Sequence, residues 1–283
     1  MQHDPRVTPA RPDLAAAHLA GKVSADRFVE GVARRAVVPL SPLKRRPAFD
    51  APLETEVLAG EAVTVYEEEE GWAWVQLADD GYVGWMSANA LAAPDPAPTR
   101  RVTALRTFLY PGASIKAEPL GWLSMGATVA VTRMDGAFAA TPLGFIYASH
   151  LAPPTEQAVD FVAVAESLIG APYLWGGKSS LGLDCSGLVQ LSLAMTGHAA
   201  RRDSDMQEKE LGQPLAIDQD LLRRGDLVFW KGHVGIMRDA DTLLHANGHH
   251  MLVVSEPLAE ARARILAKGA GPVTSIRRLN TQA

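Results

Sequence analysis

The sequence predicts an α+β protein in which two small β-barrels precede a unit of helices and antiparallel strands. Short β-prone runs separated by turn residues fill the first half of the chain, and this pattern occurs twice. A proline-rich stretch at 93–98 divides the two sets, and after residue 154 the pattern turns first helical and then strand-like. At 283 residues the chain is long for one domain, so several compact units are expected.

The composition is that of an ordinary globular protein. With 47% hydrophobic and 21% charged residues and a formal net charge of -5, neither a disordered chain nor a dominant nucleic-acid partner is expected. The single cysteine excludes an intrachain disulfide. The chain has no CxxC, HExxH or phosphate-loop motif, so we predict that it needs no metal and no cofactor.

The N-terminal residues, 1–36, are expected to form a helical arm. The apolar run near the start is too short and too interrupted for a signal-peptide core, and no run reaches the roughly 18 apolar residues of a membrane span. We therefore expect a cytoplasmic protein without a membrane partner. Export by a route without a classical signal stays open as an alternative.

Two barrels are expected at 37–95 and 96–153. Each contains alternating apolar residues and an Asp-Gly hairpin turn, at Asp80-Gly81 and at Asp135-Gly136. A degenerate repeat of two units of about fifty residues is the simplest explanation.

The last unit, 154–283, is expected to carry two helices, at 159–169 and 182–196. Four strands should follow these helices, which gives the α+β layout. Their expected ranges are 226–230, 233–237, 242–246 and 251–256.

Cys185 is the candidate nucleophile. A glycine-rich segment that begins at Trp175-Gly176-Gly177 delivers it to the start of the second predicted helix. There, free backbone N–H groups and the positive end of the helix dipole favour a thiolate, which is the reactive form. A neighbouring imidazolium would lower the thiol pKa further.

Two of the eight histidines are candidates for activating this thiol. The other six fall in the arm, in turns or at the ends of elements, where surface roles are expected. His233 opens one predicted strand and His245 lies on the next, and facing side chains of neighbouring strands are about 5 Å apart. We predict that His233 is the base and that His245 orients it. For each residue alone, a structural role would be the ordinary interpretation; the three together favour catalysis.

These residues carry a family resemblance. Five ordered segments resemble the signature of NlpC-type cell-wall peptidases: 175–177, 184–187, 225–230, 232–236 and 245–246. The resemblance spans about 157–278 and implies a papain-like fold in which a cysteine thiolate attacks an amide of murein stem peptides. It also implies a tyrosine, Tyr173, near the oxyanion. The two predicted barrels resemble bacterial SH3-like domains.

A further resemblance narrows the substrate. The barrels, the missing export signal and the segment Arg202-Asp203-Ser204 resemble the subgroup called dipeptidyl-peptidase VI, a γ-D-glutamyl-L-diamino acid endopeptidase. Its members cut after L-Ala-γ-D-Glu in released murein peptides and recognise a free N-terminal L-Ala. A buried substrate ammonium needs a carboxylate, and Asp203 is the candidate, with Ser204 beside it.

The same resemblance suggests further substrate-binding residues. Tyr82 and Glu56 of the first barrel would face the substrate amine, with an aromatic residue of the barrel surface as the alternative for Tyr82. Asp184 and Ser186 flank the nucleophile, and Asp184 could also cap the helix. Trp175 would either shape the cleft or belong to the core.

The sequence thus predicts a cytoplasmic cysteine peptidase that splits the γ-D-Glu to diamino acid bond of free murein peptides during recycling. One alternative is an exported murein hydrolase that acts on intact peptidoglycan, and another is a catalytically silent wall-binding protein. Neither the oligomeric state nor the choice of diaminopimelate or lysine can be predicted from the sequence.

Overall fold

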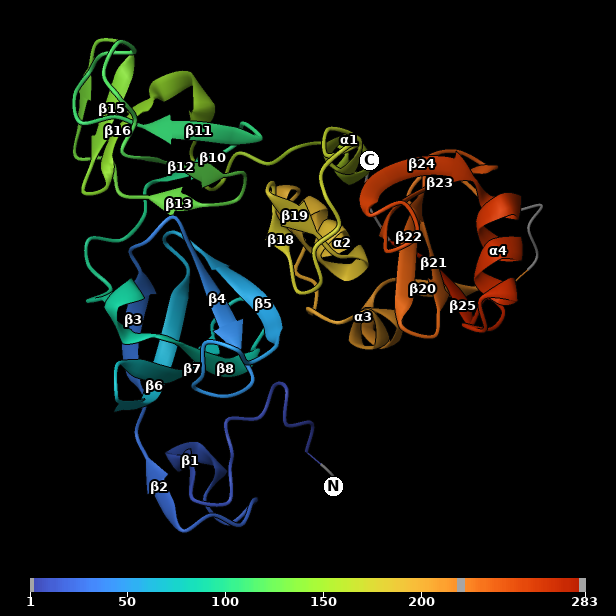
Figure 1. Cartoon of the computed structure of the whole chain (residues 1–283), viewed down its shortest axis with the longest axis horizontal. Helices are drawn as coiled ribbons and strands as arrows, with labels where there is room; N and C mark the ends of the chain where they lie inside the picture. Colours follow the sequence, from blue (N-terminus) through green and yellow to red (C-terminus); the bar gives the residue numbers. More distant parts are fainter. Residues whose placement is uncertain (1–2, 218–221, 280–283) are drawn as a thin grey trace. The chain divides into compact units, whose positions relative to one another are not determined.

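The computed structural model describes residues 3–217 and 222–279, and the chain divides after Glu156 into two compact units (Figure 1). Small parts of the predicted arm and of the last predicted domain, 1–2, 218–221 and 280–283, lie outside the described residues. In the part of the chain that is described, no helix is both long and apolar enough to cross a membrane.

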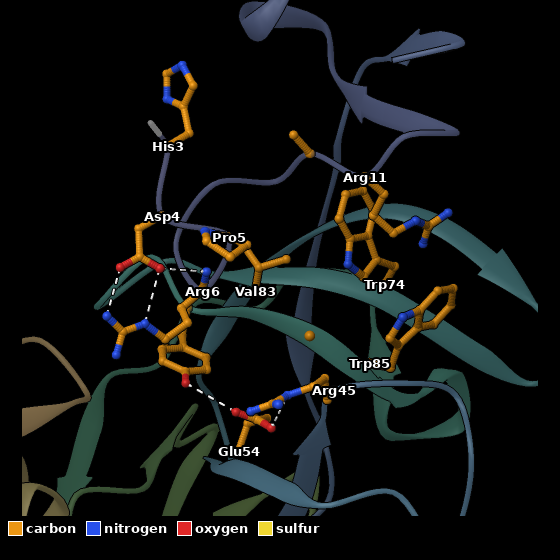
Figure 2. A pocket seen from close by; sticks show the side chains of 13 residues that line it. His3, Asp4, Pro5, Arg6, Arg11, Arg45, Glu54, Trp74, Val83 and Trp85 are labelled. Carbon is orange, nitrogen blue, oxygen red and sulfur yellow. Dashed lines mark hydrogen bonds and ion pairs between the residues drawn. The ribbon is translucent and has the colours of Figure 1, made fainter. Parts of the chain in front are cut away.

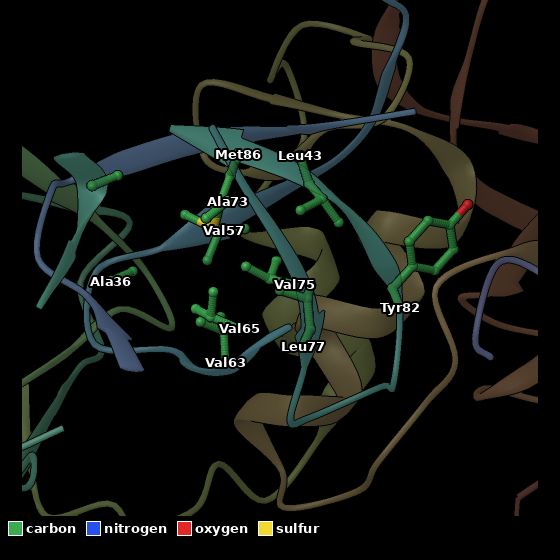
Figure 3. Packing of buried hydrophobic residues seen from close by; sticks show 11 residues of the cluster. Ala36, Leu43, Val57, Val63, Val65, Ala73, Val75, Leu77, Tyr82 and Met86 are labelled. Carbon is green, nitrogen blue, oxygen red and sulfur yellow. The ribbon is translucent and has the colours of Figure 1, made fainter. Parts of the chain in front are cut away.

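The first unit contains a seven-stranded sheet in the order β5-β4-β8-β7-β6-β3-β9. Its strands are β3 (Val32–Ala36), β4 (Leu40–Lys44), β5 (Leu53–Leu58), β6 (Ala62–Glu69), β7 (Trp72–Leu77), β8 (Val83–Ser87) and β9 (Leu91–Ala92). Inward-facing residues of these strands form one aliphatic cluster that includes Leu43, Val65, Val75 and Met86 (Figure 3). The predicted turn at Asp80-Gly81 is confirmed, and Gly81 has a φ of 78° there.

The predicted helical arm is wrong. The described residues before 37 contain only short strands, β1 (Leu14–Ala16), β2 (Arg27–Val29) and β3, with one 3-10 turn at Ala17–Leu19. Leu14 is fully buried against Trp74 and Trp85, so packing on the sheet decides its conformation. Because β3 pairs with both β6 and β9, the sheet begins at Val32, before the predicted boundary at residue 37.

The rest of the first unit is a second set of short antiparallel strands. They are β10 (Arg100–Val102), β11 (Arg106–Leu109), β12 (Gly121–Ser124), β13 (Thr128–Val129), β14 (Arg133–Asp135), β15 (Phe138–Thr141), β16 (Gly144–Tyr147) and β17 (Leu151–Ala152). Both sets end alike, because a strand, a 3-10 turn and a two-residue strand follow one another in β8 to β9 and again in β16 to β17. Leu58 and Ala59 of the first set share a buried cluster with Val102 and Ile146 of the second.

The second unit is a six-stranded sheet with helices packed against it. The strand order is β20-β25-β21-β22-β23-β24, and neighbouring strands are antiparallel. The strands are β20 (Gln213–Leu215), β21 (Asp226–Trp230), β22 (His233–Met237), β23 (Thr242–Asn247), β24 (Leu252–Pro257) and β25 (Ser275–Arg278). A small hairpin of β18 (Lys178–Ser179) and β19 (Gly182–Leu183) stands apart from this sheet.

Four helices complete the second unit: α1 (Phe161–Glu166), α2 (Cys185–Met195), α3 (Ser204–Glu210) and α4 (Leu258–Ala267). Helix α2 contacts β22 and β23, and α4 lies on the other side of the sheet (Figure 1). Leu258 and Ala261 of α4 pack on Val228 and Trp230. The sheet is therefore covered on both faces, and this arrangement brings the start of α2 against the start of β22.

Candidate active site

Asp184 fixes the loop that presents Cys185. Its carboxylate accepts hydrogen bonds from the backbone N–H of Gly187 at 2.7 Å and of Gly176 at 2.9 Å. The first bond caps α2, and the second ties the glycine-rich segment to the cap. A Cβ on Gly187 would lie 2.1 Å from the carbonyl oxygen of Gly177, so only glycine allows this close approach.

The guanidinium of Arg202 forms an ion pair with the Asp184 carboxylate. Its side chain is fully buried, and its two terminal nitrogens donate to the two carboxylate oxygens of Asp184 at 2.9 and 2.6 Å. It also donates to the hydroxyl of Ser186 at 3.0 Å. Burial of an ion pair is favourable only when both partners keep such bonds, so this pair specifies the loop geometry. The sequence singled out Arg202 only as part of a segment and missed this role.

Cys185 is the first residue of α2 and is buried. Burial and the nearby Asp184 carboxylate raise the pKa of the thiol to about 12, while backbone N–H groups of Val234 and Ser186 act in the opposite direction. The contact with Val234 places the sulfur beside the first residues of β22, where His233 lies. In this structure, therefore, Cys185 is a neutral thiol that needs a base.

His233 and His245 lie together, as the sequence predicted. His233 Nε2 is 2.8 Å from His245 Nδ1, and the ring centroids are 5.0 Å apart. Burial and the neighbouring His245 lower the pKa of His233 to about 3. Because Nε2 of His233 is hydrogen-bonded to His245, Nδ1 of His233 is the nitrogen that can accept a proton from Cys185.

His245 Nε2 has two side-chain neighbours, Glu256 and Asn247, and Arg264 binds the first of them. Glu256 Oε1 is 2.7 Å and Asn247 Nδ2 is 3.0 Å from His245 Nε2, and Arg264 forms an ion pair with the same carboxylate. Sequence reasoning missed all three residues. The available signal was one acidic residue in the otherwise mostly apolar run 251–256, on the strand next to that of His245.

Tyr173 can stabilise an oxyanion. Burial raises the pKa of its phenol above the usual range, and the charges of Cys185 and Asp184 raise it further. The hydroxyl therefore stays protonated and can donate a hydrogen bond. The bridge between Tyr173 and Leu183 places Tyr173 beside the segment that leads to Cys185.

Four more predicted substrate residues belong to the second unit. Asp203 and Ser204 are half-buried at the start of α3, immediately after Arg202. Ser186 is buried, and its hydroxyl donates to Asp184 at 3.2 Å. Trp175 is 70% exposed, so the expectation that it could belong to the core is wrong. Gly176, which follows it, turns the chain with a φ of 78°.

Tyr82 and Glu56 belong to the first unit. Tyr82 is buried at the edge of the aliphatic cluster, with its hydroxyl directed away from it (Figure 3). The alternative that Tyr82 is merely a surface aromatic is therefore wrong. Its hydroxyl is 3.4 Å from Glu54 Oε2, and Arg45 forms an ion pair with Glu54 at 2.7 Å (Figure 2). Glu56 is buried on β5.

A cavity of about 690 Å³ lies beside Tyr82 in the first unit (Figure 2). Residues near the N-terminus, including Arg11, and strands of the first sheet line it. The Arg11 guanidinium lies over two indole rings, 4.3 Å from the centroid of Trp74 and 5.0 Å from that of Trp85. Among the described residues, no group of three His, Cys, Asp or Glu side chains could hold a metal ion.

Comparison with known proteins now decides the family. Residues 170–264 match the model of the NlpC/P60 family, and residues 43–91 match a bacterial dipeptidyl-peptidase SH3 domain. The gamma-D-glutamyl-L-lysine dipeptidyl-peptidase of Bacillus subtilis is 30% identical over 70% of this chain and 73% of its own length. The chain belongs to the NlpC/P60 family.

Further relatives agree with this assignment to the NlpC/P60 family. Dipeptidyl-peptidase 6 of Lysinibacillus sphaericus is 26% identical over 75% of this chain and 86% of its own length. The crystal structure of an NlpC/P60 family protein from Bacillus cereus is similar with a TM-score of 0.72 at 21% identity, covering 87% of this chain and 99% of that one. The second unit thus has the papain-like NlpC/P60 fold, and the protein is a peptidase.

Proposed function

We propose that this NlpC/P60 peptidase hydrolyses the γ-D-Glu to diamino acid bond of free murein peptides whose N-terminal L-Ala is unblocked. One observation carries the proposal: the buried Cys185, His233 and His245 cluster occurs in a chain that also matches a dipeptidyl-peptidase SH3 domain. The names of the relatives, gamma-D-glutamyl-L-lysine dipeptidyl-peptidase and dipeptidyl-peptidase 6, support the same bond.

The geometry supports a two-step mechanism. His233 Nδ1 accepts the thiol proton, and the Cys185 sulfur attacks the carbonyl carbon of the scissile amide. Tyr173 donates a hydrogen bond to the resulting oxyanion. The C–N bond then breaks, His233 returns the proton to the leaving amine, and a thioester remains on Cys185. Water, deprotonated by His233, hydrolyses the thioester and restores the thiol.

Asp203 is proposed as the partner of the substrate ammonium. It follows Arg202 directly, and Arg202 is anchored to Asp184 next to the nucleophile, so the backbone at Asp203 is fixed relative to Cys185. Ser204, Ser186 and Trp175 are proposed to line the same subsite. The roles of Tyr82 and Glu56 toward the amine stay predictions, because these residues belong to the other unit.

The N-terminal β-strands are proposed to form two SH3-like barrels. The matched model covers residues 43–91, within the first strand set. The second set, 100–152, is assigned by the strand, 3-10 turn and short strand with which both sets end. We also propose a cytoplasmic location and a role in recycling; detection of the protein outside the cytoplasm on cell fractionation, together with activity on intact sacculi, would favour the murein hydrolase alternative.

The amine requirement is tested with L-Ala-γ-D-Glu-diaminopimelate and its N-acetylated form. The free peptide should be cleaved and the acetylated one should not, and an Asp203→Asn variant should show a raised KM for the free peptide. The matched control is Asp205→Asn, since Asp205 lies two residues further along α3 in an i,i+4 pair with Lys209. Equal cleavage of both peptides would reject the amine-recognition proposal.

A further inference from the structure

Glu256 and Arg264 form an ion pair behind the two histidines. Glu256 lies on β24 and Arg264 on α4, and their side chains are 10% and 20% exposed. Burial alone would raise the pKa of Glu256, but its hydrogen bonds to His245 and Arg264 outweigh burial and hold the pKa at about 2. Near neutral pH the group is therefore a carboxylate, which can only accept hydrogen bonds.

The carboxylate determines the proton positions on both rings. Because Glu256 Oε1 is 2.7 Å from His245 Nε2, that nitrogen must carry a proton. In a neutral ring Nδ1 of His245 is then a bare acceptor, so the 2.8 Å contact requires a proton on Nε2 of His233. Nδ1 of His233 is left with a lone pair, which is the state that a base for Cys185 needs.

Asn247 does not reverse this assignment. Its Oδ1 accepts from the backbone N–H groups of His249 and His250, so its Nδ2 is the atom near His245 Nε2, at 3.0 Å. If Asn247 donated to a bare Nε2, the lone pair of that nitrogen would face the Glu256 carboxylate at 2.7 Å. The shorter contact to a charged acceptor outweighs the longer one to a neutral donor.

We propose that Glu256, clamped by Arg264, is a positioning residue of this peptidase: it sets the tautomer of His245 and, through it, leaves Nδ1 of His233 free to take the proton of Cys185. Neither residue touches the reacting atoms. Without the carboxylate, His245 can carry its proton on Nδ1 and donate to His233. His233 would then hold its own proton on Nδ1, facing the thiol, and that fraction of the enzyme would be inactive.

The test uses the full-length protein and three readouts. In wild type, ¹⁵N-histidine NMR should show both His233 and His245 as Nε2–H tautomers at neutral pH. In Glu256→Gln, kcat for the free murein tripeptide should fall about 10- to 100-fold with KM unchanged, the range typical for partners that orient an imidazole. Alkylation of Cys185 by iodoacetamide should slow by a similar factor, which keeps the test independent of the proposed substrate.

The matched control is Glu260→Gln, which removes an equal charge from an exposed position on the adjacent helix α4. It should leave kcat, alkylation and the histidine spectra unchanged. An Nδ1–H tautomer of His245 in wild type would overturn the proposal without any mutation, even if Glu256→Gln fails to fold. A folded Glu256→Gln variant with wild-type kcat and alkylation rate would overturn it as well.

Discussion

At the scale of single residues, burial favours the neutral forms of Cys185 and His233. It raises the pKa of Cys185 to about 12 and lowers that of His233 to about 3, and both shifts favour a neutral thiol beside a neutral ring. The proposed mechanism therefore requires the proton to move from Cys185 to His233 during the reaction. His233 can accept this proton on Nδ1, because its other ring nitrogen, Nε2, is hydrogen-bonded to His245.

The buried histidines should make folding stability depend on pH. The His233 ring has a pKa of about 3 when folded, against 6.5 as its ordinary value, so the unfolded chain takes up the proton first. The stability from a neutral His233 is complete above pH 6.5 and is lost as pH falls toward 3. The shift of His245 acts in the same direction.

Urea unfolding between about pH 7 and about pH 5 measures this effect. A buried neutral His233 should contribute a slope of about 1.4 kcal/mol per pH unit below pH 6.5. A His233→Asn variant should therefore show a smaller slope than wild type. Identical slopes would contradict the burial of a neutral ring.

Arg202 should contribute more to stability than its neighbour Arg201. Arg202→Met leaves Asp184 buried without its counter-ion, which costs about 3 to 5 kcal/mol. Arg201→Met breaks the partly exposed pair with Glu210, which is worth less than about 1 kcal/mol. Denaturant midpoints and m-values of the two variants provide the comparison, and equal losses would refute the structural role given to Arg202.

The sequence indicated Cys185, His233 and His245 because a helix start and two strands locate them by local pattern. Glu256 and Arg264 could not be found in this way. Their role depends on the register between β23 and β24 and on the side of the sheet that α4 covers, and neither is encoded in local spacing.

At the scale of elements, the strands were predicted correctly where their sequence has a clear β pattern bounded by turn residues. The strands β21 and β22 match the expected ranges 226–230 and 233–237 residue for residue. The helix at 182–196 is shorter than expected, because Gly182 and Leu183 form β19 before Asp184 caps α2. The helix predicted for residues 1–36 does not form, because packing of apolar residues such as Leu14 on the sheet outweighs the local helical pattern of the sequence.

The start of α2 depends on the absence of a side chain at Gly187. Gly187→Ala would place a Cβ 2.1 Å from the Gly177 carbonyl oxygen, so the loop carrying Cys185 must shift. We expect a loss of about 1 to 3 kcal/mol in stability and slower Cys185 alkylation. Gly112→Ala is the control, since an added Cβ there meets nothing within 4 Å. If both variants alkylated at the wild-type rate, the close approach would be unimportant.

At the scale of the whole molecule, the sequence predicted β modules followed by a peptidase unit. The division after Glu156 lies close to the expected boundary at 153–154. Composition and turn residues mark such a boundary, whereas no sequence signal tests the substrate role predicted for the first unit. The proposed role of the first unit therefore requires a functional test.

Tyr82→Phe provides that test. The aromatic ring keeps its packing, while the hydroxyl, 3.4 Å from Glu54, is lost. We expect a raised KM for the peptide with a free L-Ala amine and little change in melting temperature. Tyr66→Phe, which removes a hydroxyl 3.3 Å from Gln76 in the same sheet, should leave KM unchanged. A wild-type KM in Tyr82→Phe would remove Tyr82 from the recognition model.

The central claim is that the Cys185 sulfur carries out the hydrolysis. The most direct measurement is release of L-Ala-D-Glu from L-Ala-γ-D-Glu-diaminopimelate by wild type and by Cys185→Ala, followed by mass spectrometry. The wild-type protein should release the dipeptide, and the variant, with its fold verified by circular dichroism, should release none. Full activity in Cys185→Ala would contradict the mechanism.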